Sequence, residues 1–270
     1  KTPLANRLIA FLTRIFGSKP NHILFAFMIS AAILSSIASN VATIILFIDI
    51  TIPFLSVYKN EHDRRMSGKS FMIGLPIATV FGGMMTPAGN AANLLIIEYL
   101  AHAGVNINFM QWMGMGIPIG LFGVALTWLI ITKAYPPAAL DEAEIKEHLS
   151  INDLPAKISR SEKYALVVFM AMFILWISGT WIPYLQVTAV AIIGLACLCI
   201  PKIGIINWND YINKINLTPI LLLGTMLTFG NCLFDSGVSE WVVATVLPSA
   251  LPGSVYMVVL VISMCVSMLL

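Results

Sequence analysis

Long apolar runs alternate along the chain with short polar segments, and two of the runs are interrupted by knots of small and polar residues. The first knot is residues 35–40, Ser-Ser-Ile-Ala-Ser-Asn, and the second is residues 82–93, Gly-Gly-Met-Met-Thr-Pro-Ala-Gly-Asn-Ala-Ala-Asn. Unsatisfied polar groups are costly in hydrocarbon, so irregular backbone survives there only where it lines a cavity or is buried in protein. Two interruptions of this kind predict the ion and substrate site of a membrane transporter.

The apolar runs have the length of helices, and the pattern predicts an all-helical chain. Residues 22–38 and 41–58 form the two arms of a hairpin (22–58) joined by the polar tip Ser39-Asn40. Each arm could reach about 25 Å, so its length fits both a re-entrant hairpin and two short spans. Residues 71–100 are too long for one clean helix and contain the second knot, which predicts two half-helices with an unwound centre.

Charge along the remaining segments predicts their side of the membrane. Further predicted segments are an amphipathic interfacial helix over 1–21, a loop over 59–70, a transmembrane helix over 112–135, a cytoplasmic linker over 136–163, a pair of spans over 164–182 and 185–200, and a crossing over 217–235. Lys and Arg are concentrated in 1–21, 59–70 and 133–163, whereas 101–111 has none. The positive-inside rule therefore makes the first three cytoplasmic, including the N-terminal segment, and places 101–111 outside.

Residues 235–270 echo the start of the chain, although identities are few. Five predicted crossings separate the two copies, and an odd number predicts an inverted-topology repeat. The counterpart of Ser39-Asn40 would fall at roughly position 272, past Leu270, and the sequence starts at Lys1 rather than Met. We therefore expect a partial chain that stops before its second hairpin tip.

Composition supports an integral membrane protein, because 59% of the residues are hydrophobic and 10% are charged, against about 25% charged in soluble domains. The net charge of +2 is too small to indicate nucleic-acid binding. The four cysteines lie in apolar runs without metal-ligand spacing, so we expect them to pack or to face lipid. No stretch resembles a removable signal sequence.

The two knots resemble those of the divalent anion/sodium symporter family, whose members carry dicarboxylates, citrate or sulfate. That family has a Ser-Asn-Thr tip in each of two re-entrant hairpins, and the tip here reads Ser39-Asn40-Val41. It also has an unwound Gly-Gly-x-x-Thr-x-x-Gly-x-x-x-Asn segment, which is matched here at Gly82, Gly83, Thr86, Gly89 and Asn93. The sequence departs from the pattern at Val41, in place of threonine, and at Asp49, where the family more often has an apolar residue or proline.

The resemblance implies an all-α integral membrane protein, an inverted-repeat secondary transporter with a re-entrant helical hairpin and a broken transmembrane helix. Residues 22–111 and 217–270 would belong to a transport domain, and 164–216 to a scaffold. It implies Na⁺-coupled symport of a di- or tricarboxylate (succinate, malate or citrate class) by an elevator movement, with no organic cofactor. We expect a homodimer in the lipid bilayer of a bacterial inner membrane.

Neutral hydroxyl, amide and carbonyl oxygens suit Na⁺, and both knots supply them. The predicted sodium ligands are Ser35, Ser39, Asn40, Gly82, Gly83 and Asn93. Ser35 and Ser39 are four residues apart, so we expect their hydroxyls on one helical face beside Asn40. A neutral cage with Na⁺ is positive, and helix N-termini aimed at the same point also favour an anion without Arg or Lys. By resemblance, the substrate contacts are Asn40, Val41 (backbone), Thr86, Pro87 and Asn90.

The sequence leaves other functions open. Asp49 is a candidate for proton or cation coupling, since carboxylates within membranes are functional candidates. With Val41, it favours a related carrier of sulfate or arsenite, or a proton-coupled one. An intramembrane enzyme is disfavoured, because Ser39 has no His or Lys near it in sequence, and we expect no catalytic residues. A non-transporting membrane scaffold remains an alternative. A separate alternative is that Ser35, Ser39 and Gly89 are small residues that serve close helix packing.

Overall fold

The computed structural model describes residues 19–102, 104–139, 159–182, 187–201, 203–214 and 217–238, together with Ile15, Leu185, Trp241 and Thr245. These residues form helices and no strand, which confirms the predicted all-helical chain for the part described. The chain divides into two compact units, Lys1–Asn207 and Trp208–Leu270, and each is described by itself.

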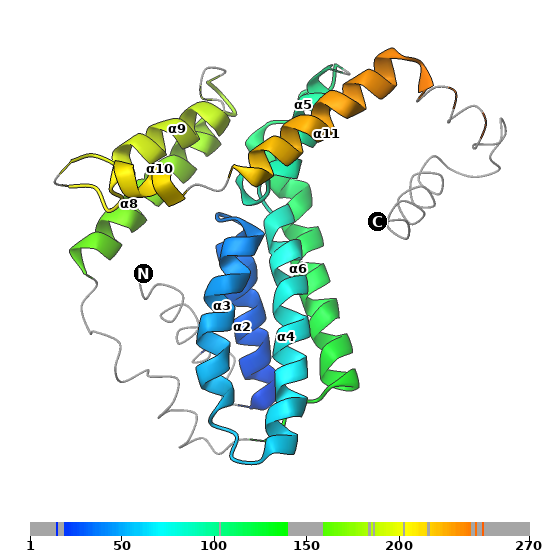
Figure 1. Cartoon of the computed structure of the whole chain (residues 1–270), viewed down its shortest axis with the longest axis vertical. Helices are drawn as coiled ribbons and strands as arrows, with labels where there is room; N and C mark the ends of the chain where they lie inside the picture. The colour runs from blue at the N-terminus through cyan, green and yellow to red at the C-terminus, as the bar shows by residue number, and fades with distance from the viewer. Residues whose placement is uncertain are drawn as a thin grey trace. The chain divides into compact units, whose positions relative to one another are not determined.

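A bundle of four helices forms most of the first unit. These helices are α2 (Pro20–Ser35), α3 (Asn40–Leu55), α4 (Glu61–Met84) and α6 (Phe109–Ala134). Helix α4 packs against the other three, and α2 also contacts α3 and α6 (Figure 1). Between α4 and α6 the chain forms the 3₁₀ turn η1 (Pro87–Gly89) and helix α5 (Ala91–His102). The interior of the bundle is therefore built around α4.

Four phenylalanines from three helices fill the centre of this bundle. Phe27 of α2 contacts Phe47 and Phe54 of α3 and Phe71 of α4, with ring centroids 5.2 to 6.4 Å apart. None of the four is more than 3% exposed. Because interdigitated rings leave little free volume, they fix the spacing of α2, α3 and α4.

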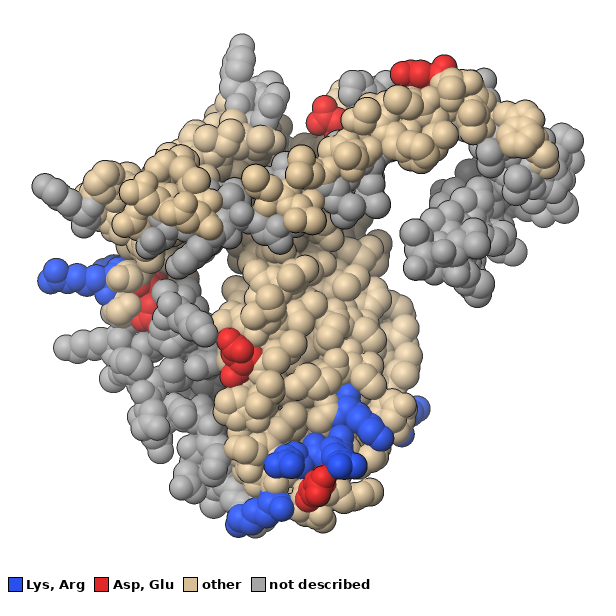
Figure 2. Space-filling view, viewed as in Figure 1, with Lys and Arg blue, Asp and Glu red and all other residues tan. Residues whose placement is uncertain are grey.

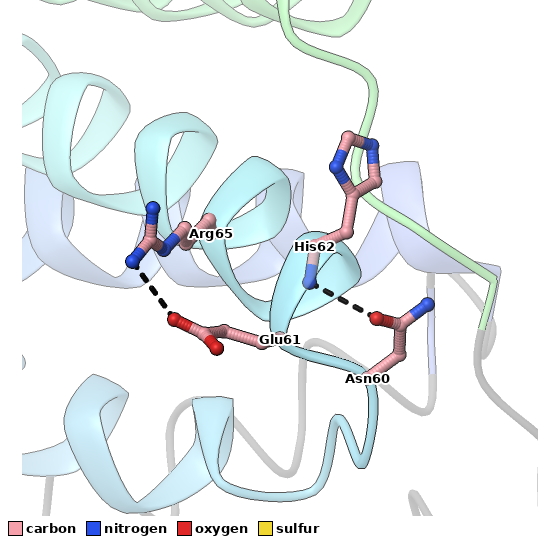
Figure 3. A network of polar contacts seen from close by, with 4 residues as sticks. All are labelled: Asn60, Glu61, His62 and Arg65. Atoms are coloured by element: carbon pink, nitrogen blue, oxygen red, sulfur yellow. Dashed lines mark hydrogen bonds and ion pairs between the residues drawn. The ribbon is translucent and has the colours of Figure 1, made fainter.

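Helix α4 begins at Glu61, so the predicted loop over 59–70 is wrong and most of it is helical. Asn60 Oδ1 accepts a hydrogen bond from the His62 backbone N–H at 3.0 Å, which caps the helix. The Arg65 guanidinium lies 2.8 Å from the Glu61 carboxylate one turn away (Figure 3). This ion pair is exposed and contributes little, so the cap and the acidic first turn decide where α4 starts.

The end of the bundle where α3 leads into α4 is basic. Figure 2 shows Lys and Arg side chains gathered there. The described basic residues of the segments that meet at this end are Lys19, Lys59, Arg64, Arg65, Lys69 and Lys133. Ser70 Oγ donates to the Tyr135 carbonyl, and Ser67 Oγ accepts from the Ala138 backbone N–H at 3.0 Å. The chain that leaves α6 is thus fastened to the start of α4.

Two further helices of the first unit pack on each other. They are α8 (Arg160–Ser178) and α9 (Val187–Leu198). Helix α8 starts with a capping box, in which Ser159 and Glu162 accept hydrogen bonds from each other's backbone N–H groups. Phe109, at the start of α6, stacks on Trp176 of α8 with ring centroids 5.3 Å apart.

In the second unit the structure describes α10 (Trp208–Lys214) and α11 (Thr218–Asp235). Most of the predicted interfacial helix (1–21), most of the linker (136–163) and nearly all of residues 239–270 lie outside the described residues. The inverted repeat and the division into transport and scaffold domains therefore stay predictions.

Two of the described helices, α6 and α8, are long and apolar enough to cross a membrane. Helices α2, α3, α5 and α9 are apolar but shorter. With 26 residues, α6 extends about 39 Å, which exceeds the hydrocarbon core of about 30 Å.

We expect Phe27→Ala to lower the free energy of unfolding by about 3 kcal/mol, because it leaves a cavity among the other three rings. Phe122→Ala on α6 is the matched control, since this ring is 69% exposed. It should change the free energy of unfolding by less than about 0.5 kcal/mol. Thermal unfolding of the complete protein in detergent measures both variants. Equal losses would contradict the packing described.

Candidate functional site

The first knot forms the connection between α2 and α3. Helix α2 ends at Ser35, and α3 begins at Asn40 after a turn over 36–39. Ser35 is fully buried, and its Oγ lies 2.7 Å from Asn40 Oδ1 and 2.8 Å from the carbonyl oxygen of Thr79 in α4. A hydroxyl group has one hydrogen and can satisfy only one of these acceptors at a time. Three oxygens thus lie around one hydroxyl hydrogen, and such oxygen-rich surroundings suit a cation.

Ser39 does not lie on one helical face with Ser35, so this prediction from their spacing is wrong. Helix α2 has already ended, and Ser39 has non-helical backbone angles, φ −57° and ψ 138°, just before α3. Its side chain is exposed and makes no cap hydrogen bond to α3. The turn reverses the chain and brings Asn40 beside Ser35 instead. A sodium contact by Ser39 stays a prediction.

The second knot ends α4 at Met84, and α5 begins at Ala91. Carbonyl groups at the end of a helix have no partner within the helix. Asn93 is 5% exposed, and its Nδ2 donates to the carbonyls of Gly83 at 2.7 Å and Thr86 at 2.8 Å. One amide group therefore holds two points of the interrupted backbone, and the predicted sodium contact through Asn93 Oδ1 stays a prediction.

Thr86 joins the two knots. Its Oγ1 donates to the Ser36 carbonyl in the α2–α3 turn and accepts from the Gly89 backbone N–H at 3.1 Å. Residues that are 50 positions apart in sequence are thereby brought into direct contact. The polar cluster, as it is called below, consists of Ser35, Asn40, Thr79, Gly83, Thr86 and Asn93.

The glycines of the second knot leave no room for a side chain. A β-carbon on Gly82 would overlap the Ala32 backbone, and one on Gly83 would overlap Asn40 Oδ1. A β-carbon on Gly89 would lie 2.6 Å from the Gly83 carbonyl oxygen. These glycines therefore allow the hairpin turn and the interrupted helix to approach closely enough for the hydrogen bonds of the polar cluster.

The other predicted residues lie around the polar cluster or outside it. Pro87 is buried in η1, and Asn90 Oδ1 accepts from the Ala92 backbone N–H at 3.1 Å at the start of α5. Val41 is 65% exposed in the first turn of α3. Asp49 is exposed nine residues past the start of α3, about 13 Å along the helix, so it does not belong to the cluster.

Two carbonyl groups, one in the cluster and one bonded to it, have no counterpart among the predicted residues. Thr79 accepts from Ser35, and Ser36 accepts from Thr86. Main-chain oxygens carry no residue-type signal, so only the packing of α2 against α4 reveals them. In the part of the chain that the structure describes, no group of three or more His, Cys, Asp or Glu side chains comes together. The oxygens available to a cation in the cluster are therefore neutral.

A family model described as CitMHS, citrate transporter, matches residues 1–270. The chain belongs to the citrate transporter family. This family comprises transporters, so its members are multi-pass membrane proteins rather than enzymes, in agreement with the sequence analysis. The described helices alone do not decide whether the chain is a membrane protein. Family membership confirms the prediction that it is a membrane transport protein.

Curated relatives of this citrate transporter family chain include the "Sodium-dependent dicarboxylate transporter SdcS" of Staphylococcus aureus strain USA300. It is 24% identical over 270 residues, which cover 88% of this chain and 50% of the relative. The same transporter from strains NCTC 8325 and COL matches to the same extent. The chain thus spans about half the length of the curated relatives it matches. These relatives confirm the resemblance to sodium-coupled anion symporters.

Gly89→Ala should lower the free energy of unfolding by about 1–3 kcal/mol, because a β-carbon meets backbone atoms that no side-chain rotation can move away. Gly68→Ala is the control, since its β-carbon would lie 3.6 Å from Leu55 Cδ1 at an ordinary contact distance. It should be neutral or slightly stabilising within a helix. Thermal unfolding distinguishes the two variants, and an unchanged Gly89→Ala protein would show that the close approach is not required.

Proposed function

We propose that the whole protein is a secondary active transporter that carries a di- or tricarboxylate of the succinate, malate or citrate class together with Na⁺. The polar cluster is part of its binding site. One observation supports this most strongly: the oxygens of Asn40 and Thr79 both lie within hydrogen-bond distance of the single Ser35 hydroxyl, beside an interrupted helix. Membership in the citrate transporter family and the sodium-dependent relatives support the same function.

Neutral oxygens give the site its preference for a small hard cation. In the proposed ligand set, Ser35 Oγ and Asn40 Oδ1 act together with oxygens from Ser39, Gly82, Gly83 and Asn93. Bound Na⁺ supplies a positive charge beside which a carboxylate can bind. Helices α3 and α5 both begin at the cluster, and helix N-termini attract anions. Contacts to the carboxylate come from Asn40, Val41, Thr86, Pro87 and Asn90.

Helix lengths support a re-entrant hairpin. Helices α2 and α3 have 16 residues each, about 24 Å, which is shorter than the hydrocarbon core of about 30 Å. The Trp128 Nε1–H of α6 donates to the Asn21 carbonyl at the start of α2 at 2.8 Å. The hairpin turn is bonded to Thr86, and the preceding residue, Met85, lies against Gly116 of α6. These contacts place the turn near the level of Gly116 along α6. From there α6 continues about 10 Å to its first residue, so the turn would end within the bilayer.

The interrupted backbone supports reading α4 and α5 as two halves of a broken transmembrane helix. Irregular backbone at membrane depth requires partners within the protein, and Asn93 and Thr86 provide them. In the proposed orientation the basic end of the bundle and the N-terminal segment face the cytoplasm of a bacterium, and 101–111 faces outward. The family resemblance extends the proposal to an inverted repeat, a homodimer and an elevator movement of the transport domain against the scaffold.

A second candidate is a proton-coupled carrier, or a carrier of sulfate or arsenite. The exposed carboxylate of Asp49 within apolar helix α3 and the exposed Val41 at the tip favour it. Protonation of a carboxylate inside the membrane would couple transport to a proton gradient. The two candidates differ in the gradient that drives uptake.

Uptake of labelled succinate and citrate into proteoliposomes containing the complete protein tests the proposal. We expect concentrative uptake driven by an inward Na⁺ gradient. Asn40→Ala should reduce uptake at a fixed, subsaturating Na⁺ concentration at least about ten-fold, because it removes a cluster oxygen. Asn60→Ala is the control, since Asn60 caps α4 at the basic end, and it should retain uptake.

Each other result has a defined meaning. Uptake driven only by a proton gradient and lost in Asp49→Asn would assign coupling to Asp49. Equal activities of Asn40→Ala and Asn60→Ala would contradict the proposed site. If neither carboxylate is taken up under any gradient, the substrate assignment is wrong.

A further inference from the structure

One face of α6, a helix that belongs to neither knot, lies directly against the end of α4. Trp112, Gly116 and Gly120 follow one another at intervals of four residues, so they share this face. Each contacts the backbone of α4 or of the residue that follows it. The sequence pattern predicts α6 only as a membrane-spanning helix and gives it no role at the polar cluster.

Trp112 is the hydrogen-bond partner of the last carbonyl group of α4. Its Nε1–H donates to the Met84 carbonyl at 3.0 Å. The two preceding carbonyls have other donors. The Gly82 carbonyl accepts from the Met85 backbone N–H, and the Gly83 carbonyl accepts from the Asn93 amide. In an apolar environment each of these groups needs a partner. Asn93 and Trp112 thus both hold the end of α4.

The other residues that line the hollow beside the Met84 carbonyl cannot replace the indole. An apolar hollow of about 180 Å³ adjoins it, lined by Met84, Trp112, Met115, Gly116 and Ile119. Of these five residues, only Trp112 has a side chain that carries a hydrogen-bond donor. Loss of the indole N–H would therefore leave this carbonyl free to turn away from α6.

Gly116 allows α6 to come close enough for this hydrogen bond. A β-carbon there would lie 2.5 Å from the Met84 carbonyl oxygen and 3.0 Å from that of Met85. Both contacts are with backbone, so an added methyl group must move either α6 or the end of α4. On the same helix, a β-carbon on Gly114 would meet nothing within 4 Å.

We propose that Trp112 and Gly116 are positioning residues that set the Na⁺ affinity of the polar cluster through the Met84 carbonyl. This inference rests on the proposed function. Met84 directly follows Gly83, a member of the cluster, and directly precedes the irregular backbone that leads to Thr86. Since ion-binding oxygens must be held to within about 0.5 Å, a shift of Met84 is transmitted to the cluster without either residue touching the ion.

The first test compares two tryptophans of α6 in Na⁺-driven uptake by the complete protein in proteoliposomes. Trp112→Phe should raise the Na⁺ concentration for half-maximal uptake about five-fold, the effect of one lost neutral hydrogen bond. The maximal rate at saturating Na⁺ should change little. Trp128→Phe removes an equivalent indole hydrogen bond, to the Asn21 carbonyl at 2.8 Å, and should leave the half-maximal Na⁺ concentration unchanged.

The second test uses glycines and keeps both indoles. Gly116→Ala should raise the half-maximal Na⁺ concentration in the same direction as Trp112→Phe, and Gly114→Ala should not. If Trp112→Phe fails to fold, the comparison of Gly116→Ala with Gly114→Ala still tests whether this face of α6 sets the Na⁺ affinity. A merely structural role would lower thermal stability in both tryptophan variants without separating their Na⁺ dependence.

Wild-type Na⁺-driven uptake with unchanged Na⁺ dependence in Trp112→Phe and Gly116→Ala would overturn this inference and leave the proposed function intact. An equal rise in Trp112→Phe and Trp128→Phe would overturn it as well. Absence of Na⁺-driven uptake in the wild type would refute the proposed function, and the positioning role with it.

Discussion

A chain that leaves the helical path inside an apolar bundle must find new hydrogen-bond partners for the carbonyl groups it frees. Just past the end of α4 one side chain satisfies two of these groups, because the Asn93 amide donates to the carbonyls of both Gly83 and Thr86. The Thr86 hydroxyl then fastens the same stretch to the α2–α3 turn. The glycines of the second knot follow from this arrangement, since the partners are backbone groups that must come very close.

The charge distribution of the bundle fits the chemistry proposed for the cluster. The described basic residues of α4 lie in its first turns, whereas the cluster, near its end, holds only neutral oxygens. Such a cluster attracts an anion mainly when a cation is bound, because helix N-termini alone contribute only a partial charge. This dependence of anion binding on cation binding is the physical basis of symport, and it needs no lysine or arginine at the site.

The sequence was sufficient to predict the apolar helices and both knots, because small polar residues inside long apolar runs are conspicuous. It misled about Ser39, since a spacing of four places two residues on one face only while the helix continues, and α2 ends at Ser35. The start of α4 was missed although Asn60 and the acidic residues after it carry a recognisable capping signal. Thr79 and Trp112 could not be found, because their contacts join helices distant in sequence and leave no local pattern.

Binding of Na⁺ at the polar cluster can be measured without any substrate. A ligand that binds only the folded state raises the unfolding temperature as its concentration increases. The complete protein is titrated with NaCl against choline chloride at constant ionic strength. We predict that Na⁺ raises the unfolding temperature of the wild type and of Ser70→Ala, a buried serine at the basic end of the bundle. The rise should be absent in Ser35→Ala, and an equal rise in Ser35→Ala would contradict a sodium site at the polar cluster.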